Sequence, residues 1–160
     1  MRLNALVFPL LILCFSNGLL AQEKPELFSK IERVFKEKEP AWKVERINAG
    51  ESSDPARQSI VFRSEEGQAS VDVTVWEREK DAREVFAAEA LAYDNRAGKR
   101  MVKDTLPKLG DENHIWTHHG STAWPMLTLR KGKVNVTVFA PSVAVAKRFA
   151  QHVLEQMPAS

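Results

Sequence analysis

Two segments of the chain alternate strictly between apolar and polar residues, and a helical pattern follows each of them. Residues 71–75 read VDVTV, and residues 134–138 read VNVTV. An alternation of period two is typical of a strand with one buried face, and helices that follow such strands cover the faces of a sheet. The chain is therefore expected to fold as an α+β domain built around a sheet.

The two alternating segments belong to a longer internal similarity. Residues 71–91 and 134–154 align without gaps at a spacing of 63 residues. An old duplication would produce this pattern, and so would two strand-to-helix units that solve the same packing problem, since valine strands and alanine helices match easily by composition. The sequence leaves both alternatives open. The identical pairs start from Val71, Val73, Thr74, Val75, Phe86, Ala87 and Leu91.

The N-terminal residues have the three-part layout of a secretory signal. Arg2 supplies the positive charge, residues 5–15 form a nearly unbroken apolar run, and small or polar residues follow. The run is too short to span a bilayer comfortably. We expect a signal peptide over 1–21, with cleavage after Ala21 or alternatively after Gly18. Residues 22–160 would then form a single domain in the periplasm or outside the cell.

Cys14 is the only cysteine of the chain, so the exported part would contain none. Without cysteine it can form no disulfide and no thiolate nucleophile, and it has no cysteine ligand for a metal. Lipidation of Cys14 is disfavoured because Leu13 stands where lipoprotein signals require a small residue.

The formal net charge of the chain is +2, and such a balance disfavours nucleic acid as a partner. One local excess of basic residues is expected to be a solvated loop, with contact to an acidic partner or an anionic membrane surface as the alternative. It comprises Arg96, Lys99, Arg100, Lys103 and Lys108.

Periodicity and turn residues divide the exported part into helices and strands in the order α-βββ-α-βββ-α. This order predicts an antiparallel sheet flanked by helices, an α/β/α sandwich. Helices are expected at 25–40, at 81–98 and from Ser142, with a linker of about ten residues before Leu109. Strands are expected at 41–47, 57–63, 69–77, 113–118, 125–130 and 134–139.

Two hairpins can be assigned a register from the sequence. Pairing Arg63 with Gln68 places the apolar residues of both strands of the first hairpin on one face. In the second hairpin, a turn at Lys131-Gly132 places Leu129 opposite Val134.

The first helix has an apolar stripe that must dock on the sheet. The stripe consists of Leu27, Ile31, Val34 and Phe35. We expect it to cover the aromatic end of the face that carries Trp76, Met126 and Phe139, since soluble monomers rarely expose a large apolar patch.

The stretch LGDENHIWTHHG at 109–120 invites a catalytic or metal-binding interpretation. On the expected strand, His114 and His118 would lie about 13 Å apart, at about 3.3 Å per residue. They could not bind one zinc ion together, because zinc–nitrogen bonds are about 2 Å long. The chain also contains no nucleophile-elbow, phosphate-loop or dinucleotide-binding motif. We therefore predict no catalytic residue, no metal ligand and no cofactor.

Aromatic and histidine residues near the end of this strand remain candidates for binding. Trp124 precedes a proline in a loop and is the tryptophan expected to be exposed, and aromatic residues at loop tips contribute to binding surfaces. The candidate binding residues are Trp116, His118, His119 and Trp124.

The second half of the chain resembles a pattern found in small exported bacterial proteins. The resemblance rests on three segments: Leu109-Gly110-Asp111-Glu112, Arg130-Lys131-Gly132 and the strand from Val134. Asn113 stands where the pattern has an alanine. Such domains are similar to the Mog1/PsbP-like fold, which includes extracytoplasmic sensor and lipoprotein domains. The resemblance implies a binding or sensing scaffold and no shared catalytic residues.

These observations lead to an exported, non-enzymatic binding or interaction domain of the cell envelope as the expected function. The alternative is a hydrolase or metal-dependent enzyme that uses His114, His118 or His119 at the end of a strand. A third alternative is an accessory subunit of an envelope complex.

Overall fold

The computed structural model describes residues 18–48, 57–97, 101–106, 108–118 and 124–157. Within these residues the chain forms three helices and seven strands. The helices are α1 (Gly18–Lys38), α2 (Glu79–Ala97) and α3 (Val143–Leu154). The strands are β1 (Lys43–Asn48), β2 (Arg57–Ser64), β3 (Gly67–Val75), β4 (Met101–Asp104), β5 (Glu112–His118), β6 (Met126–Lys131) and β7 (Val134–Phe139).

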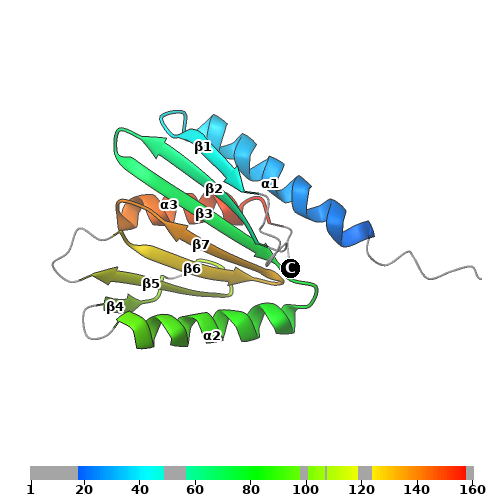
Figure 1. Ribbon diagram of the computed structural model, residues 1–160, viewed down its shortest axis with the longest axis vertical. Helices are drawn as coiled ribbons and strands as arrows, with labels where there is room; N and C mark the ends of the chain where they lie inside the picture. Colours follow the sequence, from blue (N-terminus) through cyan, green and yellow to red (C-terminus); the bar gives the residue numbers. More distant parts are fainter. Residues whose placement is uncertain (1–17, 49–56, 98–100, 107, 119–123, 158–160) are drawn as a thin grey trace, which may run out of the picture.

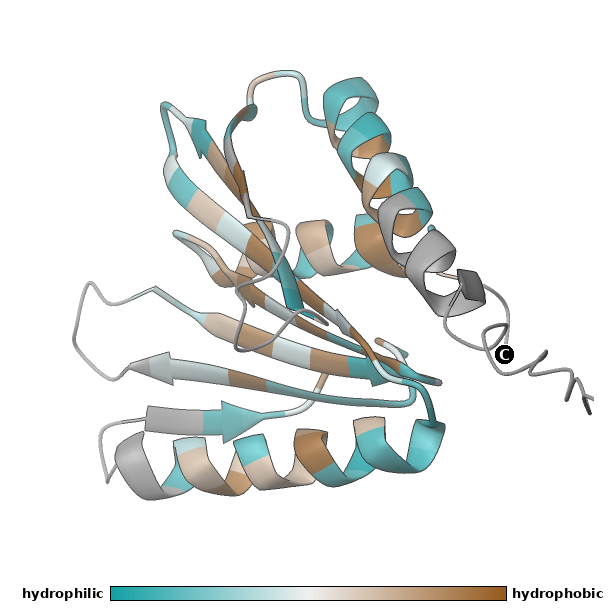
Figure 2. Cartoon of the chain, turned by 45° about the vertical axis from the view of Figure 1, so that its right-hand side comes forward, coloured by the Kyte–Doolittle hydropathy of each residue, from teal (hydrophilic) through white to brown (hydrophobic). Residues whose placement is uncertain are grey.

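All seven strands belong to one antiparallel sheet in the order β1-β2-β3-β7-β6-β5-β4. Helices flank this sheet on both sides, which confirms the predicted α+β class and the antiparallel sheet flanked by helices (Figure 1). We call the face that packs against α1 and α3 the first face, and the face that packs against α2 the second face. Apolar and polar residues alternate along the central strands, as brown and paler bands in Figure 2.

The main hydrophobic core lies between the first face and the two helices α1 and α3. Phe35 of α1 stacks on Phe62 of β2 with ring centroids 4.5 Å apart, and it meets the edge of Phe149 of α3 at 4.6 Å. The Ser142 hydroxyl caps α3 as expected, since it accepts a hydrogen bond from the Val145 amide. The core therefore joins the first helix, the sheet and the last helix.

The prediction that α1 packs on the second face is wrong, although its stripe is buried as predicted. On the first face α1 finds the rings of Phe62 and Phe149. The apolar part of the second face is covered instead by α2, whose Ala90 packs beside Trp116 and Met126. The stripe thus docks where more apolar area is available to it.

The segment predicted as a linker contains an additional strand, β4. Its four residues pair with β5 only, from Met101 opposite His118 to Asp104 opposite Ile115. Its sequence, MVKD, places two apolar residues before two charged ones and therefore does not alternate with a period of two. For this reason the sequence pattern did not indicate the strand.

The two predicted hairpin registers have different outcomes. Arg63 pairs with Gln68 as predicted. In the second hairpin Lys131 pairs with Val134 and Leu129 with Val136, two residues from the predicted register. The two-residue turn therefore consists of Gly132 and Lys133. Gly132 has a φ of 54°, the positive value that the first position of such a turn requires. A shift of two leaves every side chain on its predicted face.

The repeated strands β3 and β7 are neighbours at the centre of the sheet, where Val73 pairs with Val136, the residue 63 positions later. The helices that follow them lie on opposite faces. In the second unit the helix packs on the face that bears the valines, whereas in the first unit it packs on the other face. The two units therefore cannot be superposed as equivalent pairs, which favours two independent packing solutions over a duplication.

Within the part of the chain that the structure describes, none of the helices combines the length and the apolar character needed to cross a membrane.

Candidate functional site

The LGDE and RKG segments of the resemblance form one structural unit around Arg130. The side chain of Arg130 is 4% exposed, and its Nε donates to Glu112 Oε1 at 2.8 Å. Its Nη1 donates to the Gly132 carbonyl at 2.9 Å and lies 3.3 Å from Asp111 Oδ2. The amide of Gly132 in turn donates to Asp111 Oδ2 at 2.8 Å. Asp111 and Glu112 therefore hold the β6–β7 hairpin in place.

A third carboxylate connects this unit to α2. Glu79, in the first turn of α2, lies 3.3 Å from Arg130 Nη1 and also pairs with Arg83. Three acidic side chains thus share one buried guanidinium, and each is at least two-fifths exposed. Asp111 and Glu112, the acidic residues of the stretch 109–120, are therefore explained as ion-pair partners of Arg130. An acid–base catalytic role is not needed to account for them.

Asn113 fixes the segment between β4 and β5. Its Oδ1 accepts a hydrogen bond from the Leu106 amide at 2.6 Å, and its Nδ2 donates to the carbonyls of Leu106 and Leu109 at 2.8 Å. An alanine could form none of these contacts. The departure from the resembled pattern at this position therefore has a structural role.

His114 lies on the second face of β5 and is packed between aromatic rings. Its imidazole stacks on Phe86 of α2 at 5.3 Å and meets Trp116 edge-on at 5.5 Å. Burial lowers the pKa of His114, and the nearby charge of Lys103 lowers it further. The imidazole is thus held neutral at a pH where an exposed histidine begins to protonate.

The described residues contain no group of three histidine, cysteine, aspartate or glutamate side chains that could hold a metal ion. His119 and the side chain of His118 lie outside the described residues. The enzymatic alternative therefore retains His114 as its one described candidate, and the ring contacts of His114 are those of a packed residue.

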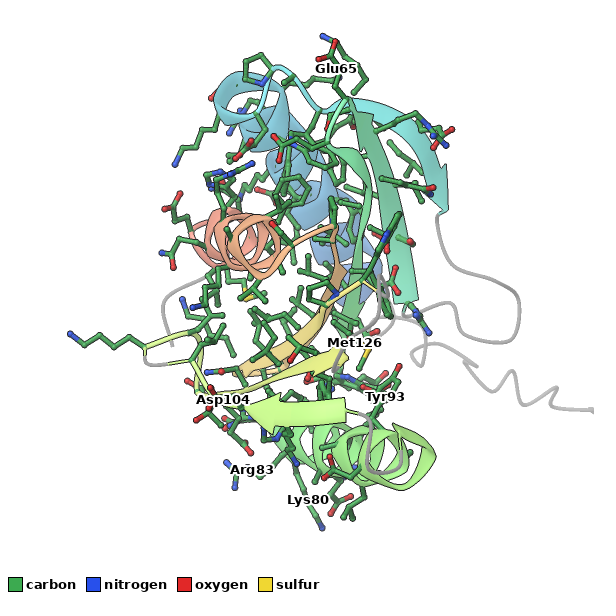
Figure 3. All side chains as sticks on the ribbon, turned by 90° about the vertical axis from the view of Figure 1, so that its left-hand side faces the viewer. Glu65, Lys80, Arg83, Tyr93, Asp104 and Met126 are labelled. Carbon is green, nitrogen blue, oxygen red and sulfur yellow. The ribbon has the colours of Figure 1, made fainter. Side chains whose placement is uncertain are left out.

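Trp116 is the centre of the second, smaller apolar cluster, which we call the aromatic end. Trp116 is 1% exposed and lies with Met126 and Ala90, while Tyr93 and Phe139 pack against them as partly buried residues. Because α2 covers Trp116, this side chain is not exposed at the surface, and its role in binding stays a prediction. Figure 3 shows Tyr93 and Met126 close together where the sheet meets α2.

Asp94 of α2 closes the aromatic end by two hydrogen bonds. Its Oδ1 accepts from Trp116 Nε1 at 3.1 Å, and its Oδ2 accepts from Lys103 Nζ at 2.8 Å. The hydrogen bond from Lys103, followed by that from Trp116, holds the pKa of Asp94 below its ordinary value. The ammonium of Lys103 also lies 5.8 Å from the centre of the Trp116 ring, within the range of a cation–π contact.

The predicted basic group is only partly described. Lys103 is paired with Asp94 and is therefore not a free cation. Lys108 is exposed and has a φ of 62°, whereas Lys99, Arg100 and the side chain of Arg96 lie outside the described residues. Contact with an acidic partner remains a prediction for this group.

Trp124 is 42% exposed, as the sequence predicts. It stands two residues before Met126, and the Pro125 carbonyl between them accepts a hydrogen bond from the Ala140 amide at 3.3 Å. This hydrogen bond extends the β6–β7 pairing toward Trp124. Trp124 directly precedes this paired residue and lies two positions along the chain from Met126 of the aromatic end.

Sequence reasoning missed the contribution of α2 to this region. No local signal in the sequence distinguishes the residues of α2 that face the sheet from those that face solvent, because the outer side of α2 also carries alanines and an exposed Leu91. The residues that were missed are Phe86, Ala90, Tyr93 and Asp94. The carboxylate of Asp94 could be assigned only once the position of Trp116 in the sheet was known.

Comparisons with known proteins identify a structure with a similar fold but do not assign the chain to a family. No family model and no curated protein matches the chain. Among solved structures, the crystal structure of a GTP binding regulator from Thermotoga maritima is similar, with a TM-score of 0.50 and 12% sequence identity. The similarity covers 78% of this chain and 82% of that chain. At this level of identity it supports a shared fold alone.

Proposed function

We propose that the chain is an exported, non-enzymatic binding or interaction domain of the cell envelope, and that Trp124 beside the aromatic end is its contact surface. The observation that carries the proposal is the 42% exposure of the Trp124 side chain, two residues before Met126 of the aromatic end. An exposed indole at the margin of an apolar cluster offers a large, rigid contact area at a low cost in conformational entropy.

The contacts of the other described candidates support a binding role over catalysis. His114 is packed between aromatic rings, and Trp116 donates a hydrogen bond to Asp94. The acidic pair Asp111 and Glu112 forms ion pairs with Arg130. Each group has a local structural partner that accounts for its position. Trp124 is the described candidate whose exposed area has no such account.

We also propose that the domain belongs with the exported domains of the Mog1/PsbP-like fold. The contact between Asp111 and Gly132 supports this assignment, because it joins the two segments that carry the resemblance. The Thermotoga maritima protein is a GTP binding regulator. We do not propose GTP binding for this chain, since the likeness is one of fold and the sequence contains no phosphate loop.

Site-specific photocrosslinking in intact bacteria tests the proposal. The full chain, with its own N-terminal segment, receives a photoreactive phenylalanine analogue at position 124, and at position 91 in a matched control. Leu91 is 64% exposed on α2 and is therefore at least as accessible as Trp124. We expect a discrete adduct in the envelope fraction from position 124 that position 91 does not form. Equal patterns from the two positions would remove Trp124 as the contact surface.

The location of the protein is measured in the same cells. We expect the chain in the exported fraction, with Gln22 or Leu19 as its first residue according to the cleavage site. A chain that retains Met1 and stays in the cytoplasm contradicts export. The size of the adduct separates a small ligand from a protein partner, and thus separates a binding domain from a subunit of an envelope complex.

A further inference from the structure

We propose that α2 is a displaceable cover of the second face, which detaches as a unit while the sheet, α1 and α3 stay folded. The proposal does not depend on the proposed binding role. It concerns how Trp116 and Met126, which α2 buries, become accessible.

Among the described residues, α2 buries fewer large apolar side chains than either of the other two helices. All the buried residues of α3 belong to the main core, and they include Phe149, Val153 and Leu154. The described part of α2 buries Ala82, Phe86 and Ala90, of which two are alanines. Since the free energy gained by burial is roughly proportional to apolar area, α2 is held less strongly than α3.

The sheet beneath α2 is polar over part of its area, unlike the first face. Thr128, Arg130 and Asn135 are buried there. Asn135 donates from Nδ2 to the Ala82 carbonyl at 3.0 Å, whereas its Oδ1 and the Nδ1 of His114 have no hydrogen-bond partner among the described residues. A polar floor loses less free energy on exposure to water than an apolar one. Displacement of α2 is therefore less costly than displacement of α1 or α3.

Charged side chains hold α2 near both ends of its described part. Near its start, Glu79 lies 3.3 Å from Arg130 Nη1. Near its end, Asp94 accepts from Lys103 Nζ at 2.8 Å and from Trp116 Nε1 at 3.1 Å. Ion pairs with exposed members weaken as salt screens them. The closed position is thus sensitive to ionic strength in a way that the apolar docking of α3 is not.

Native-state hydrogen exchange tests the proposal on the folded protein. Peptides that cover residues 79–94 are compared with peptides that cover 143–154, after correction for the intrinsic rates of each sequence. We expect amides of α2 to exchange at least about tenfold faster than those of α3, as a cooperative unit, and to accelerate further as salt is raised from about 0.05 to 0.5 M. Equal corrected exchange of the two helices overturns the proposal, because α2 would then open only with the whole fold.

A pair of variants on α2 provides the matched control. Asp94→Ala removes the contacts with Lys103 and Trp116, whereas Glu84→Ala removes a solvent-exposed pair with Lys80 at 3.6 Å. We expect D94A to raise the exchange of α2 several-fold with α3 unchanged, and E84A to leave both helices as in the wild type. Parallel acceleration of α2 and α3 in D94A contradicts the proposal. If D94A does not fold, the wild-type comparison and its salt dependence still decide it.

Discussion

A Cβ atom at Gly110 would lie 2.6 Å from the carbonyl oxygen of Arg130. Gly110 also has a φ of 72°, a conformation that L side chains rarely adopt. The same carbonyl accepts a hydrogen bond from the Asp111 amide at 2.8 Å. The chain that leads into β5 therefore passes directly against the backbone of β6, and glycine is the residue that permits this approach.

We expect Gly110→Ala to lower the free energy of unfolding by about 3 kcal/mol. About 1 kcal/mol comes from the left-handed backbone, and about 2 kcal/mol from the contact with the Arg130 carbonyl, because neither backbone can move freely. Gly132→Ala is the matched control, since Gly132 has a φ of 54° but a Cβ added there would meet no atom of the described residues within 4 Å. It should cost about 1 kcal/mol. Urea denaturation measures both, and equal losses would show that the close approach relaxes without cost.

We expect Arg130→Met to lower the free energy of unfolding by about 2 kcal/mol. Removal of one member of a buried ion pair costs more than this when the remaining charges stay buried. Here the three carboxylates are partly exposed and can be hydrated once the guanidinium is lost. Arg83→Met, which removes an exposed partner of Glu79, should cost less than about 0.5 kcal/mol. A similar loss in both variants would contradict the structural role of Arg130.

Features that depend on local pattern were predictable from the sequence. The alternation around Val73 and Val136 indicated two strands that prove to be central, and Ser142 indicated the start of α3. The face chosen by α1 was not predictable, because its stripe fits any apolar surface. That choice depends on the positions of Phe62 in β2 and Phe149 in α3, which are set by the tertiary structure.

The candidate site was predictable only in part. The exposure of Trp124 follows from its place before a proline, whereas the burial of Trp116 depends on α2, a helix with weak amphipathic character. Histidines near a strand end look alike in the sequence, whether they stack on a ring or face solvent. His114 could be assigned to packing only when Phe86 was found across from it.

We expect Phe35→Ala to lower the free energy of unfolding by about 3 kcal/mol, because Phe35 is 1% exposed and contacts the rings of Phe62 and Phe149. Phe28→Ala, on the same helix, should cost less than half as much, since Phe28 is only partly buried. Denaturation curves of the two variants and the wild type provide the comparison. A wild-type midpoint for F35A would mean that α1 is not part of the cooperative fold.

We expect the stability of the protein to depend on pH through His114. Burial, with the charge of Lys103, lowers the pKa of His114 from its ordinary value of 6.5. The unfolded chain therefore binds a proton at this residue at a pH where the folded chain does not. The contribution of His114 to stability is complete above about pH 6.5 and is lost as the pH falls toward the lower pKa of the folded state.

His114→Phe removes this titration and keeps an aromatic ring to stack on Phe86. Between about pH 7.5 and 5.5 the wild type should lose more of its free energy of unfolding than H114F does. The other histidines and the carboxylates contribute equally to both proteins, so the difference isolates His114. The same difference should persist in a His152→Gln background, because His152 lies on α3 and contacts Glu39 instead. Equal acid losses in wild type and H114F would mean that the imidazole of His114 protonates as readily in the folded chain as in the unfolded one, and that the stack on Phe86 does not shield it from water.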